Sequence, residues 1–500
     1  MDWLPLSPLL VCLAMVILCC FFWSHVAIQK IIHVIGASIL FIVVVLVYYQ
    51  VMERGILVVQ VGHYMAPFGI SIVIDMFSAM MLFITAIIAL CVSIYALIDI
   101  SVHLQNLGFY PAYWVLLLGI CGAFSTGDLF NLYVWFEVML IASFVLMVLG
   151  YHKIQLDGAV KYVGMNLVAT IFMLTGIALL YGMTGTLNMA DLSWRLSQQT
   201  ALSVSIVALL LTMAFAIKAA LFPLFFWLPA SYHTTTVSTS ALFAGLLTKV
   251  GIYALIRLTT LIVPHDRWIM SGLLVSAGFT MLTGVLGAMS QYHLRRILSF
   301  HIISQIGYMV MGLAIGTPLA LAGAIFYIAH HIIVKTNLFL ISGIVHRLGK
   351  SFDIHRLSGF YKHHPLLTAL FFISALSLAG FPPLSGFWAK FSLLKAAFIH
   401  GNSIIAFIAL LVSFLTLYSM IKIWNSVFWK GREEAREVQN ADALSWGEKM
   451  GLFTPVVVLV GITLIMSFMP QMFFYVAMQI SAQLLDPTEY IHVVLGATAP

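Results

Sequence analysis

Charged residues are scarce in this sequence. Only 8% of its 500 residues are Asp, Glu, Lys or Arg, whereas soluble domains carry about 25%. Extended polar stretches are scarce as well, and 62% of the chain is hydrophobic, so no water-soluble domain is expected. This balance predicts an integral membrane protein built from apolar helices.

Cofactor motifs are also missing. The five cysteines lie in apolar segments without a Cys-x-x-Cys spacing, so neither an iron-sulfur cluster nor a redox disulfide is expected. No Walker sequence and no dinucleotide-type glycine pattern occurs. Haem held between helices needs facing histidines on two spans, whereas the adjacent His330 and His331 point about 100° apart on a helix. We therefore expect no cofactor and no metal.

The formal net charge is +6, but the basic residues are scattered, so nucleic acid is not expected as a partner. The first ten residues carry an acid, Asp2, and no positive segment, so they do not resemble a cleaved signal peptide. The first apolar run is expected to stay as a helix. The hydrophilic segment Lys430–Lys449 mixes both signs of charge and is typical of a solvated inner loop, or else of a docking segment for a partner.

Apolar runs of the length that a bilayer demands, about 17 to 25 residues, occur fourteen times. Only residues 125–128 separate the fourth run from the fifth, so thirteen spans is the alternative. An even number places both termini on one side of the membrane. The runs begin near Leu4, Ile31, Ile70, Ala112, Leu129, Val160, Ser203, Thr235, Trp268, Ile297, Pro318, Leu366, Ser403 and Leu452.

The basic residues of the loops predict which side that is, because Lys and Arg concentrate on the cytoplasmic side. With both termini outside, thirteen of them fall in inner loops and four in outer loops, so both termini are expected outside. The inner residues are Lys30, Lys153, Lys161, Arg295, Arg296, Arg347, Lys350, Arg356, Lys362, Lys430, Arg432, Arg436 and Lys449. The outer residues are Arg54, Arg195, Arg257 and Arg267.

The remaining six basic residues fall within predicted spans, and all are lysines: Lys218, Lys249, Lys335, Lys390, Lys395 and Lys422. Arginine stays protonated, whereas a desolvated lysine can release its proton. Holding these lysines and Glu137 charged at the bilayer centre would cost about 20 kcal/mol. We therefore expect them to have a function, except for Lys395 and Lys422, whose amines lie near the membrane faces and can reach water.

Lys218 lies just before a predicted helix break. Pro223 and Pro229 follow it within the apolar stretch Thr212–Pro229, and proline removes a backbone donor and clashes with the preceding turn. Irregular backbone at membrane depth is tolerated only where it faces protein or water. The pattern therefore predicts an internal hydrated path. The alternative is that Lys218 reaches the membrane surface and that Pro223 only ends a helix.

A similar break recurs in the twelfth apolar run. Residues 220–224 (ALFPL) match residues 379–384 (AGFPPL), which contain Pro382 and Pro383. Lys390 follows this second break, whereas Lys218 precedes the first one. Paired interrupted helices are typical of transporters built from inverted repeats, and the reversed position of the lysine fits repeats of opposite orientation.

Glu137, Lys249 and the pair His331 and Lys335 are the next candidates. Glu137 lies inside the fifth span and is either a structural acid or a mobile counter-charge for Lys218. Lys249 lies midway along the eighth span and either donates to backbone carbonyls or passes protons. His331 and Lys335 are four residues apart in the eleventh span and share one helix face, which favours a relay.

The secondary candidates are Tyr327, His330, His301 and Asp75. Tyr327 lies one turn before His331. His330 points to another side of the same helix, and both it and His301 are either hydrogen-bonded core residues or proton carriers. Asp75 opens the third span and is expected to be an interfacial acid or a contact to a partner subunit.

The candidate residues lie in motifs that follow one another over nearly the whole chain: VWFEVMLIASF, AIKAALFPLFFWLP, LLTKVGIYALIR, ILSFHIISQIGYM, HHIIVKTNLFL and AGFPPLSGFWAKF. In these motifs the chain resembles the antiporter-like membrane subunits shared by respiratory complex I, membrane-bound hydrogenases and multisubunit Mrp-type Na⁺/H⁺ antiporters. Lys390, in place of a glutamate, departs from the complex I subunit of similar length. The long C-terminal extension of the larger Mrp subunit is missing, so a shorter subunit of the Mrp branch is most similar.

The resemblance implies an all-α polytopic membrane protein of about fourteen transmembrane helices, with inverted five-helix repeats and broken seventh and twelfth helices. It divides a single membrane domain into helices 1–3 (residues 4–110), the first repeat (111–262), the second repeat (266–428), and an inner loop, last helix and short tail (429–500). It also implies an ionisable row of Glu137, Lys218, Lys249, His331, Lys335 and Lys390.

The expected function follows from this row. Protons would pass along it from the Glu137–Lys218 pair to Lys390, driven by the proton gradient and exchanged for Na⁺. The subunit would work only together with other membrane subunits. The expected location is a bacterial or archaeal cytoplasmic membrane. The chain itself has no catalytic centre. One alternative is a proton-pumping subunit of a redox-driven complex, and another is a structural subunit with a closed channel. The sequence does not indicate whether Na⁺ passes through this subunit or from which side the proton comes.

Overall fold

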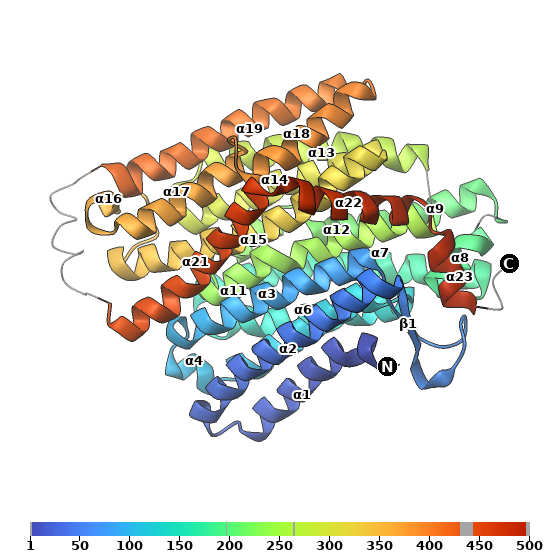
Figure 1. Ribbon diagram of the computed structural model, residues 1–500, viewed down its shortest axis with the longest axis horizontal. Coiled ribbons are helices and arrows are strands. Elements are labelled where there is room, and N and C mark those ends of the chain that lie inside the picture. Colours follow the sequence, from blue (N-terminus) through green and yellow to red (C-terminus); the bar gives the residue numbers. More distant parts are fainter. Residues whose placement is uncertain (1–2, 197, 264–265, 431–443, 497–500) are drawn as a thin grey trace.

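The computed structural model describes residues 3–196, 198–263, 266–430 and 444–496, and most of these residues are helical. Figure 1 shows the helices running along the long axis of the molecule. Segment 430–449, expected to be a solvated inner loop, lies largely outside the described residues. Helices are the natural structure for such apolar runs, because within lipid a helix satisfies its own backbone polar groups.

The N-terminal part contains three long helices and a β-hairpin. The hairpin strands are antiparallel, with Leu57 opposite Ile74. Asp75 begins the third long helix by accepting a hydrogen bond from Ser78 N at 2.9 Å. The elements are η1 (Leu4–Leu6), α1 (Ser7–Phe21), α2 (Val26–Arg54), β1 (Leu57–Gln60), η2 (Val61–His63), β2 (Ser71–Ile74), α3 (Met76–Asp99) and α4 (Val102–Asn106).

The middle part contains the first broken helix, formed by α9 and α10, and an eighth span that includes two π-helical segments, η3 and η4. The elements are α5 (Phe109–Ser125), α6 (Leu129–Val148), α7 (Lys153–Thr184), α8 (Met189–Leu196), α9 (Ala201–Ala219), α10 (Trp227–Ser231), α11 (Val237–Leu242), η3 (Phe243–Leu247), α12 (Thr248–Arg257) and η4 (Leu258–Ile262).

The last part contains the second broken helix, formed by α17 and α18. The elements are α13 (Arg267–Met289), α14 (Leu294–Ile315), α15 (Pro318–Gly349), α16 (Phe360–His363), α17 (Pro365–Ala379), α18 (Ser385–Ile399), α19 (Ser403–Ile423), η5 (Trp424–Trp429), α21 (Trp446–Phe468), α22 (Pro470–Leu485) and α23 (Thr488–Leu495).

The described residues contain the fourteen spans that the sequence predicts. Twelve helices are long and apolar enough to cross a membrane, and the shorter apolar helices α5 and α17 complete the number. The fourth and fifth spans are separate helices, so thirteen spans is wrong. The β-hairpin, α8, α22 and α23 are not predicted by the apolar runs, because they are short or amphipathic.

Both ends of the described chain lie at the same end of the bundle. In Figure 1, α1 begins toward the right-hand end, where the hairpin and α23 also lie, whereas α4 and α16 lie at the opposite end. This arrangement agrees with an even number of spans.

The two broken helices end in the same way. Each stops at a residue in the left-handed conformation, Ala220 (φ +61°) in one and Gly380 (φ +86°) in the other. In each, the next N–H donates to the carbonyl five residues back, at 2.9 and 3.1 Å, which is the Schellman pattern. Glycine adopts this conformation freely, whereas alanine does so only at a cost of about 1–2 kcal/mol.

The structure corrects the register of the match between the breaks by one residue. Ala220 corresponds to Gly380 rather than to Ala379, so Pro223 corresponds to Pro383, and Pro382 takes the place of a phenylalanine. All three prolines lie between the half-helices, where no helical hydrogen bond is lost.

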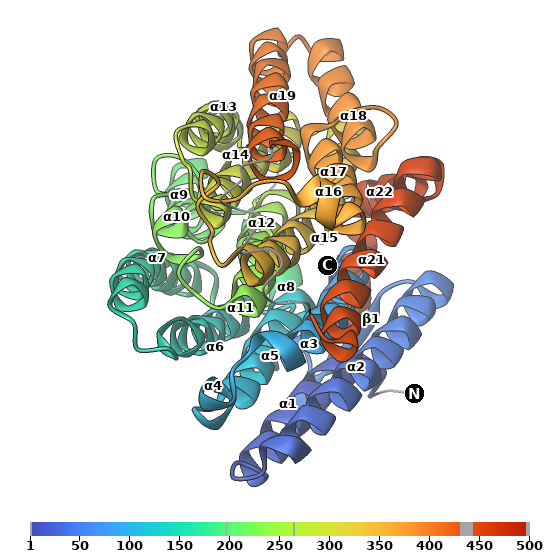
Figure 2. The same cartoon turned by 90° about the vertical axis from the view of Figure 1, so that its left-hand side faces the viewer.

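The eighth and eleventh spans form the centre of the bundle. Every residue in the most apolar window of 237–262 and of α15 is buried, compared with 33% for α1 and α2. Figure 2 shows α12 and α15 enclosed by the other helices. Side chains on these two spans therefore lie away from lipid.

Candidate functional site: a buried row of ionisable side chains

The predicted row begins at Glu137 and Lys218. Glu137 lies on α6, is half-buried, and accepts a hydrogen bond from Thr170 Oγ1 at 2.6 Å. Lys218 lies in the last turn of α9 and is 5% exposed, with its Nζ 4.7 Å from the centre of the Phe136 ring. The two charges interact electrostatically, but among the described ion pairs none joins them directly. The carboxylate is held by Thr170 instead.

A small cavity lies beside Lys218. Its volume is about 20 Å³, which holds about one water molecule. Tyr162 and Asn166 of α7 line it, together with Tyr232 and with Leu247 of η3. Lys218 therefore shares a small space with three polar side chains, at the junction of the fifth, sixth, seventh and eighth spans.

Lys249 lies on α12 and has no exposed surface. Its Nζ donates to Ala244 O, five residues back, at 2.5 Å. Ala244 belongs to the π-helical segment η3, in which the regular i to i−4 hydrogen bonds are interrupted. The interruption makes a backbone oxygen available to the amine, which keeps two further donors when it is an ammonium group.

Two glycines bring the eighth span against its neighbours. A Cβ on Gly251 would lie 2.7 Å from Ala219 N, so α12 packs directly on the end of α9 beside Lys218. A Cβ on Gly245 would lie 2.4 Å from Thr336 Oγ1 of α15. Only a residue without a side chain allows these approaches. The eighth span thus contacts both the seventh and the eleventh.

His331 and Lys335 lie on α15, and both have no exposed surface. Lys335 Nζ donates to Leu298 O of α14 at 3.2 Å. Among the described residues, neither ring nitrogen of His331 has a hydrogen-bond partner. The electrostatic neighbours of His331 are Lys249, Lys335, His330 and Lys390. The imidazole therefore interacts electrostatically with three lysines of the row.

The secondary candidates on the central helices have partners of their own. His330 Nδ1 lies 2.8 Å from Ser385 Oγ, and His301 Nε2 lies 2.9 Å from Ser419 Oγ. The Tyr327 hydroxyl donates to a glutamine side chain of α14. All three side chains are buried. These contacts give each one a structural role, and a part in proton transfer stays a prediction.

Lys390 lies at the second break and is 3% exposed. Its Nζ donates to Leu378 O at 3.1 Å, Ala379 O at 2.9 Å and Ser413 Oγ at 3.2 Å. The two carbonyls are at the C-terminal end of α17, where the helix dipole attracts a positive charge. All three donors of an ammonium group have an acceptor here, unlike those of Lys218 at the first break.

Lys395 and Lys422 differ from the row, as the sequence predicts. Lys395, five residues after Lys390, is exposed. Lys422 lies near the end of α19 and donates to Met289 O at 2.8 Å and Gln291 O at 2.7 Å. Both amines thus lie toward helix ends.

The predicted position of Arg257 is wrong. Arg257 lies in the last turn of α12 and is 5% exposed, not in an outer loop. It forms an ion pair with Asp75, which is 1% exposed, and its Nε donates to Tyr253 Oη at 3.1 Å. The paired carboxylate explains how a permanently charged residue is tolerated within a span. Asp75 therefore has its partner within this chain, and the spans do not contain lysine alone.

Three residues of α7 are missed by the sequence reasoning, although a signal was present. Tyr162, Asn166 and Thr170 recur every four residues and are all buried, so they form one buried polar face of this helix. Thr170 holds Glu137, and the other two line the cavity at Lys218. Tyr232 gives no such signal, because it follows a helix of only five residues.

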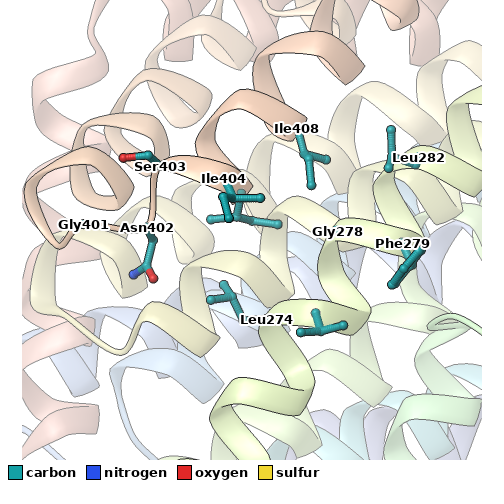
Figure 3. Close-up of a pocket in the computed structure, with 11 residues that line it drawn as sticks. Leu274, Gly278, Phe279, Leu282, Gly401, Asn402, Ser403, Ile404 and Ile408 are labelled. Atoms are coloured by element: carbon teal, nitrogen blue, oxygen red, sulfur yellow. The ribbon is translucent and has the colours of Figure 1, made fainter.

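A large groove on the second half of the chain does not belong to the row. It has a volume of about 390 Å³ and lies between α13 and α19. Figure 3 shows that Leu274, Phe279, Ile404 and Ile408 form much of its wall. No ionisable side chain lines it. Among the described residues, no three His, Cys, Asp or Glu side chains are grouped as metal ligands.

The two helix breaks, the central helices and the buried amines define the class: a polytopic membrane protein that holds ionisable groups at membrane depth, as ion-translocating proteins do. The chain belongs to the family described as NADH:quinone oxidoreductase/Mrp antiporter, transmembrane, whose profile matches residues 126–416. The family resemblance read from the motifs is confirmed.

Two relatives show which branch of the family this chain is similar to. The chain is 47% identical to the D subunit of the Na⁺/H⁺ antiporter of Alkalihalophilus pseudofirmus over 95% of both chains. It is 36% identical to the protein of the same name from Bacillus subtilis over 98% of both chains. The similarity to the Mrp branch, which Lys390 indicates, is confirmed, and within that branch the chain is similar to the D subunit.

Solved structures agree with the fold. A chain of the Mrp complex from Dietzia has a TM-score of 0.89 and 32% identity, with 99% of both chains covered. A chain of respiratory complex I from Thermus thermophilus has a TM-score of 0.80, with 96% of this chain and all of that chain covered. At 23% identity the latter shows the shared fold alone.

Proposed function

We propose that this chain is the proton-translocating subunit of a multisubunit cation/proton antiporter, and that Na⁺ is the exchanged cation. The observation that carries the proposal is the position of two buried amines, Lys218 and Lys390, at the two helix breaks of a chain whose relatives are named as D subunits of Na⁺/H⁺ antiporters. A dry structural role does not account for Lys218, whose ammonium group has no hydrogen-bond acceptor among the described residues, since buried charge without a partner is costly.

The proposed switch is the pair of Glu137 and Lys218. Approach of the carboxylate stabilises the Lys218 ammonium group, and its retreat favours release of the proton. Thr170 holds the carboxylate away from a direct ion pair in the present structure. Exchange between Thr170 and Lys218 as partners of Glu137 would then control the proton.

From Lys218 the proton passes to Lys249, whose helix packs on the end of α9, then to His331 and Lys335 on α15, and finally to Lys390. Each donor becomes neutral as the next group takes up the proton, and the row returns to its starting state when Lys390 releases that proton and Lys218 takes up a new one. Ordered water completes the path where side chains do not touch. The proton gradient supplies the free energy.

The subunit is proposed to act only within a larger complex of membrane subunits. The Dietzia chain belongs to such an Mrp complex.

Residues 111–262 and 266–428 are proposed to be two inverted repeats. The shared geometry of the breaks after Ala220 and Gly380 supports this division.

Both termini are proposed to face the outside of a bacterial or archaeal cytoplasmic membrane. Moving Arg257 into the eighth span leaves three basic residues in the outer loops, Arg54, Arg195 and Arg267, against thirteen in the inner ones. A single cysteine placed in segment 431–443 should react with an impermeant thiol reagent only in inside-out vesicles. Labelling in right-side-out vesicles would reverse the orientation.

The function is tested with Glu137→Gln and Lys218→Ala in the complete complex. Inside-out vesicles from a host without its own Na⁺/H⁺ antiporters are energised, and the proton gradient is followed by a fluorescent dye as Na⁺ is added. Both variants should assemble and show no Na⁺-dependent dissipation of the gradient. Lys395→Ala, an exposed lysine, should behave as wild type. Normal antiport by either row variant would contradict the proposal, and iron-sulfur proteins in the purified complex would favour a redox-driven pump.

A further inference from the structure

Tyr232 carries a buried hydroxyl that the fold does not use. It directly follows α10, has no exposed surface, and packs its ring against Trp227 and Phe243. Within the described part of the chain, its hydroxyl has no hydrogen-bond partner. Buried hydroxyls are nearly always hydrogen bonded, because leaving them unbonded is unfavourable. The Tyr232 hydroxyl therefore points to a small polar ligand.

The cavity at Lys218 is the place for this ligand. Tyr232, Tyr162 and Lys218 all line its volume of about 20 Å³. The Tyr162 hydroxyl lies 2.7 Å from Ser143 Oγ and, as donor and acceptor, has capacity for a second bond. Water needs a space of this size and two to four polar partners. A larger ligand does not fit, and the neighbouring amine repels a metal cation.

The cavity also reaches the eighth span, which carries the next lysine of the row. Its wall includes Leu247, which belongs to the same π-helical segment as Ala244, the backbone partner of Lys249. The contact of Gly251 with the end of α9 keeps this segment close to Lys218. A water molecule held here would contact Lys218 and the eighth span, which carries Lys249.

We infer that Tyr232 positions a water molecule against Lys218, and that this water is the first carrier of the proton from Lys218 toward the eighth span. The inference rests on the proposed function and adds a residue outside the predicted row. Lys218 gives one proton to the water and becomes neutral. The water passes one proton on toward Lys249 and is restored. Tyr232 keeps its proton and only turns its hydroxyl between donating and accepting.

The test is Tyr232→Phe in the complete complex, assayed for Na⁺-dependent proton movement in inside-out vesicles. The ring and its packing stay, and the hydroxyl is lost. We expect unchanged assembly and a rate reduced by at least about tenfold. The rate should also fall more in D₂O than that of the wild type, because proton transfer becomes limiting. Tyr181→Phe, a tyrosine on α7 that is 58% exposed, is the matched control and should transport normally.

Leu247→Phe is the second variant, and it decides the question if Tyr232→Phe does not assemble. It keeps the hydroxyl but fills the cavity with a larger side chain from the eighth span, so the same loss of transport is expected. Wild-type transport by either assembled variant would overturn the water site, and so would a loss by Tyr232→Phe without the larger isotope effect. If Lys218→Ala is inactive in that case, the proposed function stands. If Lys218→Ala is active too, the proposed function fails as well.

Discussion

Gly251 sets the distance between α12 and the first helix break, so Gly251→Ala is an informative single change. The added Cβ would lie 2.7 Å from Ala219 N, 2.9 Å from Lys218 C and 3.0 Å from Ala219 Cα. Ordinary contacts begin at 3.4 Å, so the two helices must separate by about 0.7 Å. All three atoms belong to the backbone and cannot rotate away.

The effect on stability should be small and the effect on transport large. Overpacking of this kind costs about 1–3 kcal/mol, whereas alanine gains about 1 kcal/mol over glycine within a helix. The net loss is therefore about 0–2 kcal/mol. A displacement of about 1 Å between reacting groups can lower a rate by about 100-fold. For this shift of Lys249 relative to Lys218, we expect transport to fall by about tenfold.

The assay compares Na⁺-dependent proton movement and the thermal unfolding of the purified complex. Gly164→Ala is the matched control, because nothing lies within 4 Å of its Cβ on α7. That variant should transport normally and be more stable by up to about 1 kcal/mol. If Gly251→Ala transports at the wild-type rate with unchanged stability, the direct packing of the seventh and eighth spans is refuted.

Three further changes test other parts of the structure. Gly380→Ala should destabilise by about 1–2 kcal/mol and lower transport, because φ is +86° and the Cβ would lie 2.8 Å from Lys390 Cδ; an unchanged melting temperature would speak against this geometry. Asp75→Ala should cost about 3–5 kcal/mol by leaving Arg257 unpaired, so less complex should accumulate in membranes than for the double variant Asp75→Ala with Arg257→Met; equal amounts would argue against the ion pair. Burial and the nearby Arg295 lower the pKa of His293 to about 3 and that of His233 to about 4, from 6.5. The unfolded state then binds more protons below pH 6.5, so thermal stability should fall as pH drops from about 6.5 to 4; replacing both histidines by Gln should flatten this dependence, and an unchanged slope would exclude them as its cause.

The spans and the two breaks can be predicted from sequence because both depend on local features. A bilayer sets the length of an apolar run, and proline interrupts a helix wherever it lies. The i, i+4 spacing likewise places His331 and Lys335 on one face of α15.

Contacts between distant segments explain most of what the sequence does not reveal. Asp75 and Arg257 are 182 residues apart, so a count of loop charges places Arg257 outside the membrane. Thr170 holds Glu137 from another helix. The one-residue shift between the breaks appears only in their backbone hydrogen bonds, because the sequence match aligns Phe-Pro with Phe-Pro.

The structure shows where the side chains of the row lie, and transport measurements on variants test their role in proton transfer. Lys249 and Lys390 are buried but differ in their contacts: one has a single backbone acceptor and the other three acceptors at a helix end. The sequence shows that both are lysines within spans. It does not show this difference, because the acceptors come from the π-helical turn and from the end of α17.

The most direct measurement is proton flux through the purified complex in proteoliposomes that contain a trapped pH dye. Lys249→Met and Lys390→Met are introduced together, and Lys395→Met serves as the control with the same chemical change at an exposed site. We expect the double variant to assemble and to show no Na⁺-driven proton flux, while the control keeps the wild-type rate. A wild-type rate in the double variant would contradict proton transfer along the buried amines.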